Sequence, residues 1–81
     1  MHVFKTAGVC AKEIHFDIHE GVVKDINFIN GCAGNLLGIK ALVVGQSVEE
    51  VIHRLKGIEC GSKATSCPDQ LAQALEAYMN A

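Results

Sequence analysis

The first third of the chain alternates between apolar and polar residues. From Ile14 to Ile18 every second residue is apolar, whereas His15 and Asp17 between them are polar. A period of two is typical of a strand in an antiparallel sheet that buries one face. We expect another strand ahead of this one, over residues 2–7.

A further strand is predicted directly after a tight turn. Glu20-Gly21 favours such a turn, because glycine adopts positive φ values without steric cost. The strand that follows is predicted to run from Val22 to Ile29, with Ile26 and Phe28 facing inward. Together, these segments indicate a three-stranded antiparallel sheet.

The spacing of apolar residues changes to a helical one after the loop that contains Asn30. The apolar residues between Leu36 and Val43 predict a short and mostly buried helix. Gly45 is expected to end this helix, because glycine is common just beyond a helix C-terminus.

Two more helices are predicted in the second half of the chain. Ser47 and Glu50 form a capping box, in which each side chain satisfies a backbone N–H at the start of a helix. Gly57 is expected to close this helix. The last helix is predicted from about Pro68 to Met79.

The order of elements, three strands and then three helices, predicts the fold class. We expect an α+β domain with a three-stranded antiparallel sheet followed by three helices packed on one face. The 81 residues are expected to form one domain over residues 1–81. Because so short a chain has a small core, a bound metal or a homodimer contact would add stability.

Charge and hydropathy exclude some classes of partner. The net charge is −2 and the seven Lys and Arg residues are scattered, which argues against a nucleic-acid partner. No apolar stretch approaches the roughly 20 residues of a membrane span, and no signal peptide is visible. We therefore expect a cytoplasmic protein with no membrane partner, in which cysteines are reduced, metal-bound or catalytic.

All four cysteines fall at boundaries between predicted elements, at Cys10, Cys32, Cys60 and Cys67. Cysteines that act as small core residues are expected inside elements instead. A Cys₄ zinc site is the sharpest hypothesis, with an iron–sulfur cluster second. The spacing departs from the Cys-x₂₋₄-Cys pairs that are usual in zinc sites, so free thiols in a folded scaffold are an equal alternative.

Cys67 lies where the last helix is predicted to begin. Thr65 and Ser66 can cap this helix, and the positive end of its dipole favours the carboxylate of Asp69. A helix N-terminus also favours the thiolate form of a cysteine, which attacks disulfides and binds metals. Cys67 is thus a candidate attacking thiolate in thiol–disulfide exchange, with Cys60 as the resolving thiol.

A glycine loop, Gly31-Cys32-Ala33-Gly34-Asn35, precedes the first predicted helix. Backbone amides at such a helix start bind anions, so Gly34 and Asn35 are candidate contacts for a phosphate or nucleotide. The loop lacks the Walker Lys-Ser/Thr and the Rossmann glycine spacing. Loop geometry alone also explains the glycines.

The segment Thr65-Ser66-Cys67-Pro68-Asp69 resembles the motif that gives the TSCPD domain family its name. The resemblance covers nearly the whole chain, through Gly31 to Gly38 in the middle and Leu55 to Cys60 before the motif. In this family the domain occurs as short stand-alone proteins and at the C-terminal end of ribonucleotide reductases, often those of the cobalamin-dependent class.

The resemblance implies a small module accessory to deoxyribonucleotide synthesis, with a ribonucleotide reductase or another protein as partner. An alternative is a ribonucleoside-diphosphate reductase-type thiol oxidoreductase, although 81 residues cannot hold the barrel and radical source of a reductase. A third alternative rests on layout: strands followed by helices, with cysteines at the junctions, are similar to the scaffold proteins of iron–sulfur assembly.

Overall fold

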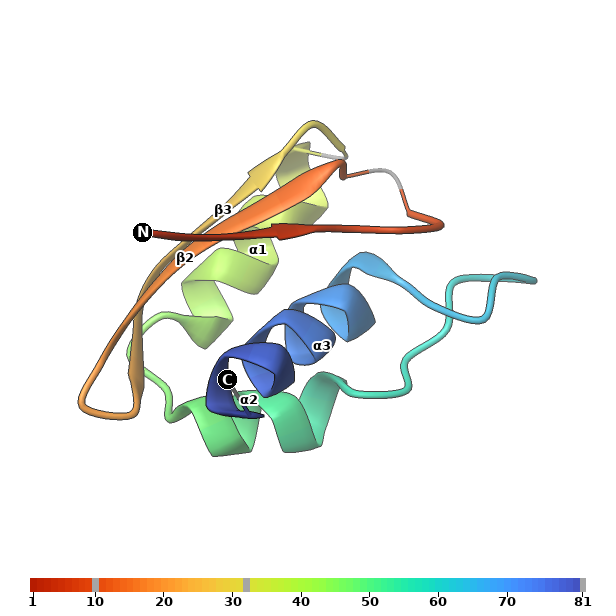
Figure 1. Ribbon diagram of the computed structural model, residues 1–81. Helices are drawn as coiled ribbons and strands as arrows, with labels where there is room; N and C mark the ends of the chain where they lie inside the picture. Colours follow the sequence, from red (N-terminus) through yellow and green to blue (C-terminus); the bar gives the residue numbers. More distant parts are fainter. Residues whose placement is uncertain (10, 32, 81) are drawn as a thin grey trace.

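The computed structural model describes residues 1–9, 11–31 and 33–80 and contains the elements that the pattern predicts (Figure 1). The described strands form one antiparallel sheet in the order β1-β2-β3, with bounds β1 His2–Lys5, β2 Glu13–His19 and β3 Val22–Ile29. The helices follow as α1 Ala33–Val43, α2 Val48–Leu55 and α3 Cys67–Asn80. The α+β fold predicted from the sequence is confirmed.

The turn between β2 and β3 contains two residues, Glu20 and Gly21, with φ values of 51° and 76°. Positive φ at both central positions gives a turn whose twist matches that of the flanking strands. The hairpin predicted at Glu20-Gly21 is therefore confirmed.

A β-bulge interrupts the pairing just after this turn. Asp17 pairs with Asp25 but Ile18 pairs with Val23, so Lys24 is an extra residue in β3. The bulge places Val23 and Ile26, three positions apart, on the inner face, where both are fully buried. Simple alternation of residues does not predict this arrangement.

The helices lie on one face of the sheet (Figure 1). α1 packs against β3, while α3 contacts β1 and β2 through Tyr78, whose ring lies 4.7 Å from that of His2 and 6.1 Å from that of Phe16. α2 packs against α3. The core combines both layers and contains Ile14, Phe16, Val23, Ile26, Val43, Val48, Val51, Leu71, Ala74 and Leu75.

The predicted limits of α2 are also confirmed. The side chain of Ser47 accepts a hydrogen bond from the backbone N–H of Glu50 at 3.2 Å, so Ser47 is the N-cap. Gly57, with a φ of 88°, follows the last turn.

The prediction that α1 is mostly buried is wrong. Leu36 and Val43 are buried against the sheet, but Leu37 is 65% exposed and Leu42 is 77% exposed. The helix covers β3 at the edge of the sheet with one side, and its other side faces outward. None of the described helices combines the length and the hydropathy needed to cross a membrane.

Candidate functional site

The start of α3 is built around Ser66. Its Oγ accepts a hydrogen bond from the backbone N–H of Asp69 at 3.1 Å and donates one to the carbonyl of Ile58 at 2.6 Å. Of the two candidate caps, Ser66 is therefore the N-cap, and it is buried. Cys67 follows as the first residue of α3 and is half-buried.

Asp69 is a buried carboxylate that joins three parts of the chain. Its oxygens accept hydrogen bonds from the backbone N–H of Gly57 at 2.7 Å, the hydroxyl of Thr65 at 2.5 Å and the amide of Gln73 at 2.8 Å. Burial, the largest single influence, raises the pKa of Asp69, but the hydrogen bonds together with the charge of Lys56 outweigh it. The net effect is a lowered pKa.

Cys60 is exposed in the loop between α2 and α3. Its backbone N–H donates to the carbonyl of Thr65 at 3.2 Å, and its carbonyl accepts from the N–H of Lys63 at 3.0 Å. These bonds close the loop, which extends away from the body of the molecule in Figure 1. The Cys60 backbone is thereby held beside Thr65, which is two residues before Cys67. Both Cys60 and Cys67 are free thiols.

The connection between β1 and β2, which contains Cys10, is attached to the start of α3. The backbone N–H of Ala7 donates to Gln70 Oε1 at 3.1 Å, and Gln70 Nε2 donates to Thr65 Oγ1 at 2.9 Å. A Cβ built on Gly8 would lie 3.4 Å from Thr65 Cγ2, in ordinary contact. One buried glutamine thus links the segment before Cys10 to the residues before Cys67.

The connection between β3 and α1, which contains Cys32, packs against the same β1–β2 connection. Gly31 has a φ of 126°, and a Cβ there would lie 2.9 Å from Leu36 Cδ1 and 3.2 Å from the backbone N of Ala11. Only glycine combines this φ with so close an approach. The residue before Cys32 therefore touches the residue after Cys10.

These contacts link the four cysteine-bearing segments in series: Gly31 approaches Ala11, Ala7 is bonded to Gln70, and Cys60 is bonded to Thr65. Cys10 and Cys32 themselves lie outside the described residues, so the predicted Cys₄ ligand set stays a prediction. Within the described part of the chain, no group of three or more Cys, His, Asp or Glu side chains is arranged to hold a metal.

The glycine loop predicted to hold an anion leads into the first turn of α1. Gly34 and Asn35 are exposed there, on the helix rather than in an extended loop. A role for them in nucleotide binding stays a prediction.

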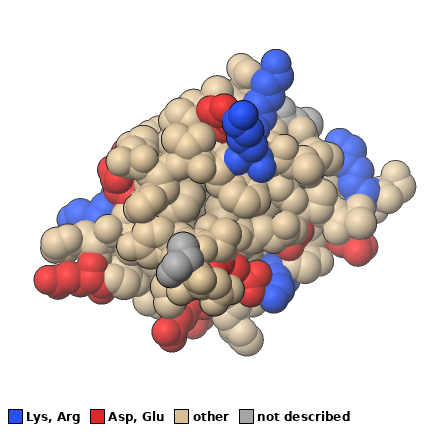
Figure 2. Space-filling model, viewed as in Figure 1, with Lys and Arg blue, Asp and Glu red and all other residues tan. Residues whose placement is uncertain are grey.

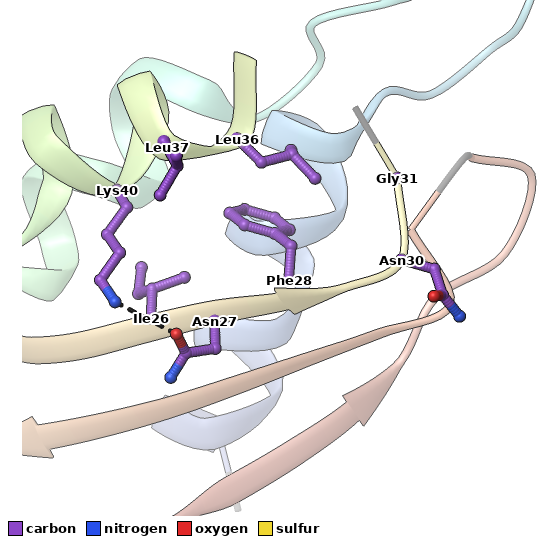
Figure 3. Close-up of a pocket in the computed structure, with 8 residues that line it drawn as sticks. All are labelled: Ile26, Asn27, Phe28, Asn30, Gly31, Leu36, Leu37 and Lys40. Carbon is purple, nitrogen blue, oxygen red and sulfur yellow. Dashed lines mark hydrogen bonds between the residues drawn. The ribbon is translucent and has the colours of Figure 1, made fainter. Parts of the chain in front are cut away.

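A groove of about 270 Å³ lies beside this turn, between β3 and α1 (Figure 3). Ile26, Phe28 and Leu36 line it, and Lys40 lies at one end. Lys40 Nζ contacts Asn27 Oδ1 and Asp25 Oδ1, each at 3.1 Å. The hydrogen bond from Lys40 lowers the pKa of Asp25, so Lys40, the cation among the described residues that line the groove, already has a counter-ion.

Charged side chains of both signs are interspersed on the face of the molecule that Figure 2 shows. In Figure 2, Lys and Arg alternate with Asp and Glu around the visible face.

The start of α3 lies within the part of the chain that a known family matches. A family model described as the TSCPD domain matches residues 2–79. The chain belongs to the TSCPD domain family. No curated protein and no solved structure matches the chain.

In this TSCPD domain, three of the five residues of the naming motif have structural roles. Ser66 caps α3, Asp69 holds the N–H of Gly57, and Thr65 bridges Asp69 and Gln70. These interactions fix the backbone around Cys67. The sequence analysis identified the capping residues but missed the role of Gln70. The only signal for that role is that Gln70 is a polar residue at a position of α3 that faces the core.

Proposed function

We propose that this TSCPD domain is a small accessory module of deoxyribonucleotide synthesis that uses a cysteine-based site and binds a ribonucleotide reductase. The contact between Gly31 and Ala11 carries the proposal, because it joins the residues next to Cys32 and Cys10. The bond from Ala7 to Gln70 brings the same connection to the start of α3, next to Cys67. The pairwise links between the four cysteine-bearing segments support a composite site.

The donor set suits zinc. Four thiolates provide the ligands of a structural Cys₄ site, and zinc binds them tetrahedrally at about 2.3 Å. A domain of 81 residues also gains stability from such a site, because metal bound only by the folded state adds its binding free energy to folding. An iron–sulfur cluster, the second candidate, takes the same four ligands.

Metal content tests this part of the proposal. Protein purified without added metal is expected to contain about one zinc per chain by atomic emission, because structural zinc sites bind tightly. Serine variants of Cys10, Cys32, Cys60 and Cys67 should each lose most of it, whereas Ser62→Ala in the Cys60 loop should retain it. Visible absorption would identify a cluster instead, and less than about 0.1 equivalent of either metal would contradict the proposal.

The exposure of Cys60 favours a second candidate function, thiol–disulfide exchange. The bond from the Cys60 N–H to Thr65 closes the loop that separates it from Cys67. In this reaction the Cys67 thiolate attacks a disulfide of the partner and releases one partner thiolate. The Cys60 thiolate then attacks the Cys67 sulfur and releases the second, so the partner gains two electrons and the chain is left with a Cys60–Cys67 disulfide.

Alkylation rates test the exchange reaction. Metal-free wild type and Cys67→Ser are treated with iodoacetamide at neutral pH, and the variant is expected to lose the fastest phase. Cys60→Ser should retain that phase of alkylation. When it is mixed with the disulfide form of the partner instead of iodoacetamide, it should accumulate a mixed disulfide through Cys67. Indistinguishable rates for wild type and Cys67→Ser would exclude Cys67 as the attacking thiol.

The partner is tested separately. The labelled chain is titrated with a ribonucleotide reductase from the same organism, and saturable binding by fluorescence anisotropy is expected. A nucleoside diphosphate added to isotope-labelled protein is expected to shift the amide signals of Gly34 and Asn35. No binding of the reductase would contradict the accessory role, and unchanged amide signals would exclude the nucleotide site at this loop.

A further inference from the structure

The rest of the chain covers the two edges of the sheet differently. At the start of β3, the backbone N–H of Val23 donates to the carbonyl of Gln46 at 2.9 Å, and the carbonyl of Val23 accepts from the N–H of Gly45 at 2.8 Å. β1 is the other edge strand. Among the described residues, no strand or isolated bridge pairs with the side of β1 that faces away from β2. This side therefore presents a row of unpaired backbone N–H and C=O groups.

A groove of about 570 Å³ lies between β1 and the last turns of α3. His2 and Phe4 border it on the strand, and Ala77 and Tyr78 border it on the helix. None of the described residues that line it is an acid, a lysine, an arginine or a cysteine. A strand added beside β1 would place every second side chain on the face of the groove, because alternate side chains of a strand point to opposite faces.

The charge beside this edge is positive at the end of β1. Lys5 is exposed, and it forms no ion pair with another described residue. Glu13 lies directly across from Lys5 on β2, but its carboxylate contacts His15 at 2.9 Å instead. Lys12, which is also exposed, lies across from Thr6 just beyond Lys5. A carboxylate on an added strand would therefore be attracted to this end of the edge.

We infer that the outer edge of β1 binds an extended acidic peptide of a partner protein by strand addition. An extended backbone satisfies a row of unpaired N–H and C=O groups, which a lipid surface or a packed helix does not. The peptide residue opposite Lys5 is Asp or Glu, and the residues opposite Phe4 and His2 are apolar and enter the groove. The peptide sequence is thus an acidic residue, an apolar one, any residue and a second apolar one.

The same charges disfavour a second copy of this chain as the occupant. Two β1 strands paired antiparallel about a twofold axis would place Lys5 opposite His2 of the other copy, and β1 contains no acidic residue. A lysine on an edge strand is a common barrier to such self-pairing. A peptide with a carboxylate at that position is attracted instead.

Fluorescence anisotropy with a labelled octapeptide tests the inference. The probe Ser-Gly-Glu-Val-Thr-Val-Gly-Ser follows the pattern, and saturable binding in the micromolar range is expected because the interface is small. Lys5→Glu should weaken binding of this probe about fivefold and strengthen binding of the same peptide with lysine in place of glutamate. Lys24→Glu, at an exposed lysine of β3, changes the net charge equally and should leave both affinities unchanged.

Methylation of the peptide backbone distinguishes strand addition from a contact between charges alone. Methyl groups on the nitrogens of one alternate set of residues should abolish binding, because they remove the donors that face β1. The other set faces solvent, and its methylation should leave binding unchanged.

Three results would overturn the inference: no binding of the acidic probe, equal effects of the two methylated sets, or equal weakening by Lys5→Glu and Lys24→Glu. Sedimentation velocity of wild type without peptide is expected to give 8.7 kDa. A dimer that excludes the probe would identify a second copy as the occupant of the edge and would overturn the inference too.

Discussion

The carboxylate of Asp69 accepts a hydrogen bond from the backbone N–H of Gly57 across 2.7 Å. Gly57 follows the end of α2, and Asp69 lies in the first turn of α3. One buried side chain therefore fixes the positions of two helices and of the loop between them, which contains Cys60.

We predict that Asp69→Asn destabilises the fold. An asparagine replaces one acceptor oxygen with an NH₂ group, which would face either the N–H of Gly57 or the donors of both Thr65 and Gln73. Losing hydrogen bonds to a buried charged group costs about 2 kcal/mol of unfolding free energy. Urea unfolding measures the loss, and Asp25→Asn, at an exposed carboxylate, is the control that should change little. Equal effects of the two substitutions would contradict the role of Asp69.

The lowered pKa of Asp69 predicts a pH dependence of stability. The unfolded state binds the proton more readily than the folded state, so unfolding is favoured as acid is added. The contribution of Asp69 is complete above its ordinary value of about 4 and is lost as the pH falls through the lower pKa of the folded state. Unfolding free energies between pH 7 and pH 2 should fall more steeply below pH 4 in wild type than in Asp69→Asn. Parallel curves for wild type and Asp69→Asn would exclude Asp69 as a source of the pH dependence of stability.

Ser66 and Ser47 offer a comparison of a buried and an exposed helix cap. Replacing either with alanine removes one bond to a backbone N–H, which costs about 1 kcal/mol. Ser66→Ala also leaves the carbonyl of Ile58 without its hydroxyl donor, so its loss of unfolding free energy should be the larger by about 1 kcal/mol. Thermal or urea unfolding of both variants measures the difference. A larger loss for Ser47→Ala would contradict the assigned hydrogen bonds of Ser66.

Alanine substitutions at Gly31 and Gly21 distinguish the energetic cost of close packing from the cost of backbone strain. Both have positive φ, but only Gly31 has atoms within 3.4 Å of an added Cβ. Gly21→Ala should cost about 1 kcal/mol from its φ alone, and Gly31→Ala should cost more because Leu36 and Ala11 must move. Gly31→Ala is also expected to lower the zinc content, whereas Gly21→Ala should leave it unchanged. Equal costs and equal zinc contents would contradict the close approach of the two connections.

The local pattern of the sequence predicts most of the fold. The alternation from Ile14 to Ile18, the Glu20-Gly21 turn and the Ser47 cap each depend on neighbours within a few residues, so they can be read without knowing the rest of the chain. The bulge at Lys24 was missed because it depends on the register between two strands.

Predictions that depend on contacts between distant residues were less successful. The exposed leucines of α1 could not be anticipated, because whether an apolar side chain is buried depends on which elements cover it. The positions of the cysteines at boundaries were evident from the sequence, but the link from Ala7 to Gln70 spans 63 residues and has no local signature. The metal ligands and the exchange of thiols stay predictions.

The contact between His2 and Tyr78 joins the first strand of the domain to its last helix. β1 is synthesised before the other elements, whereas the ring that packs against it belongs to α3. Part of one face of the sheet therefore stays uncovered until α3 has been synthesised. Folding of this domain is thus expected to be completed only after α3 has left the ribosome.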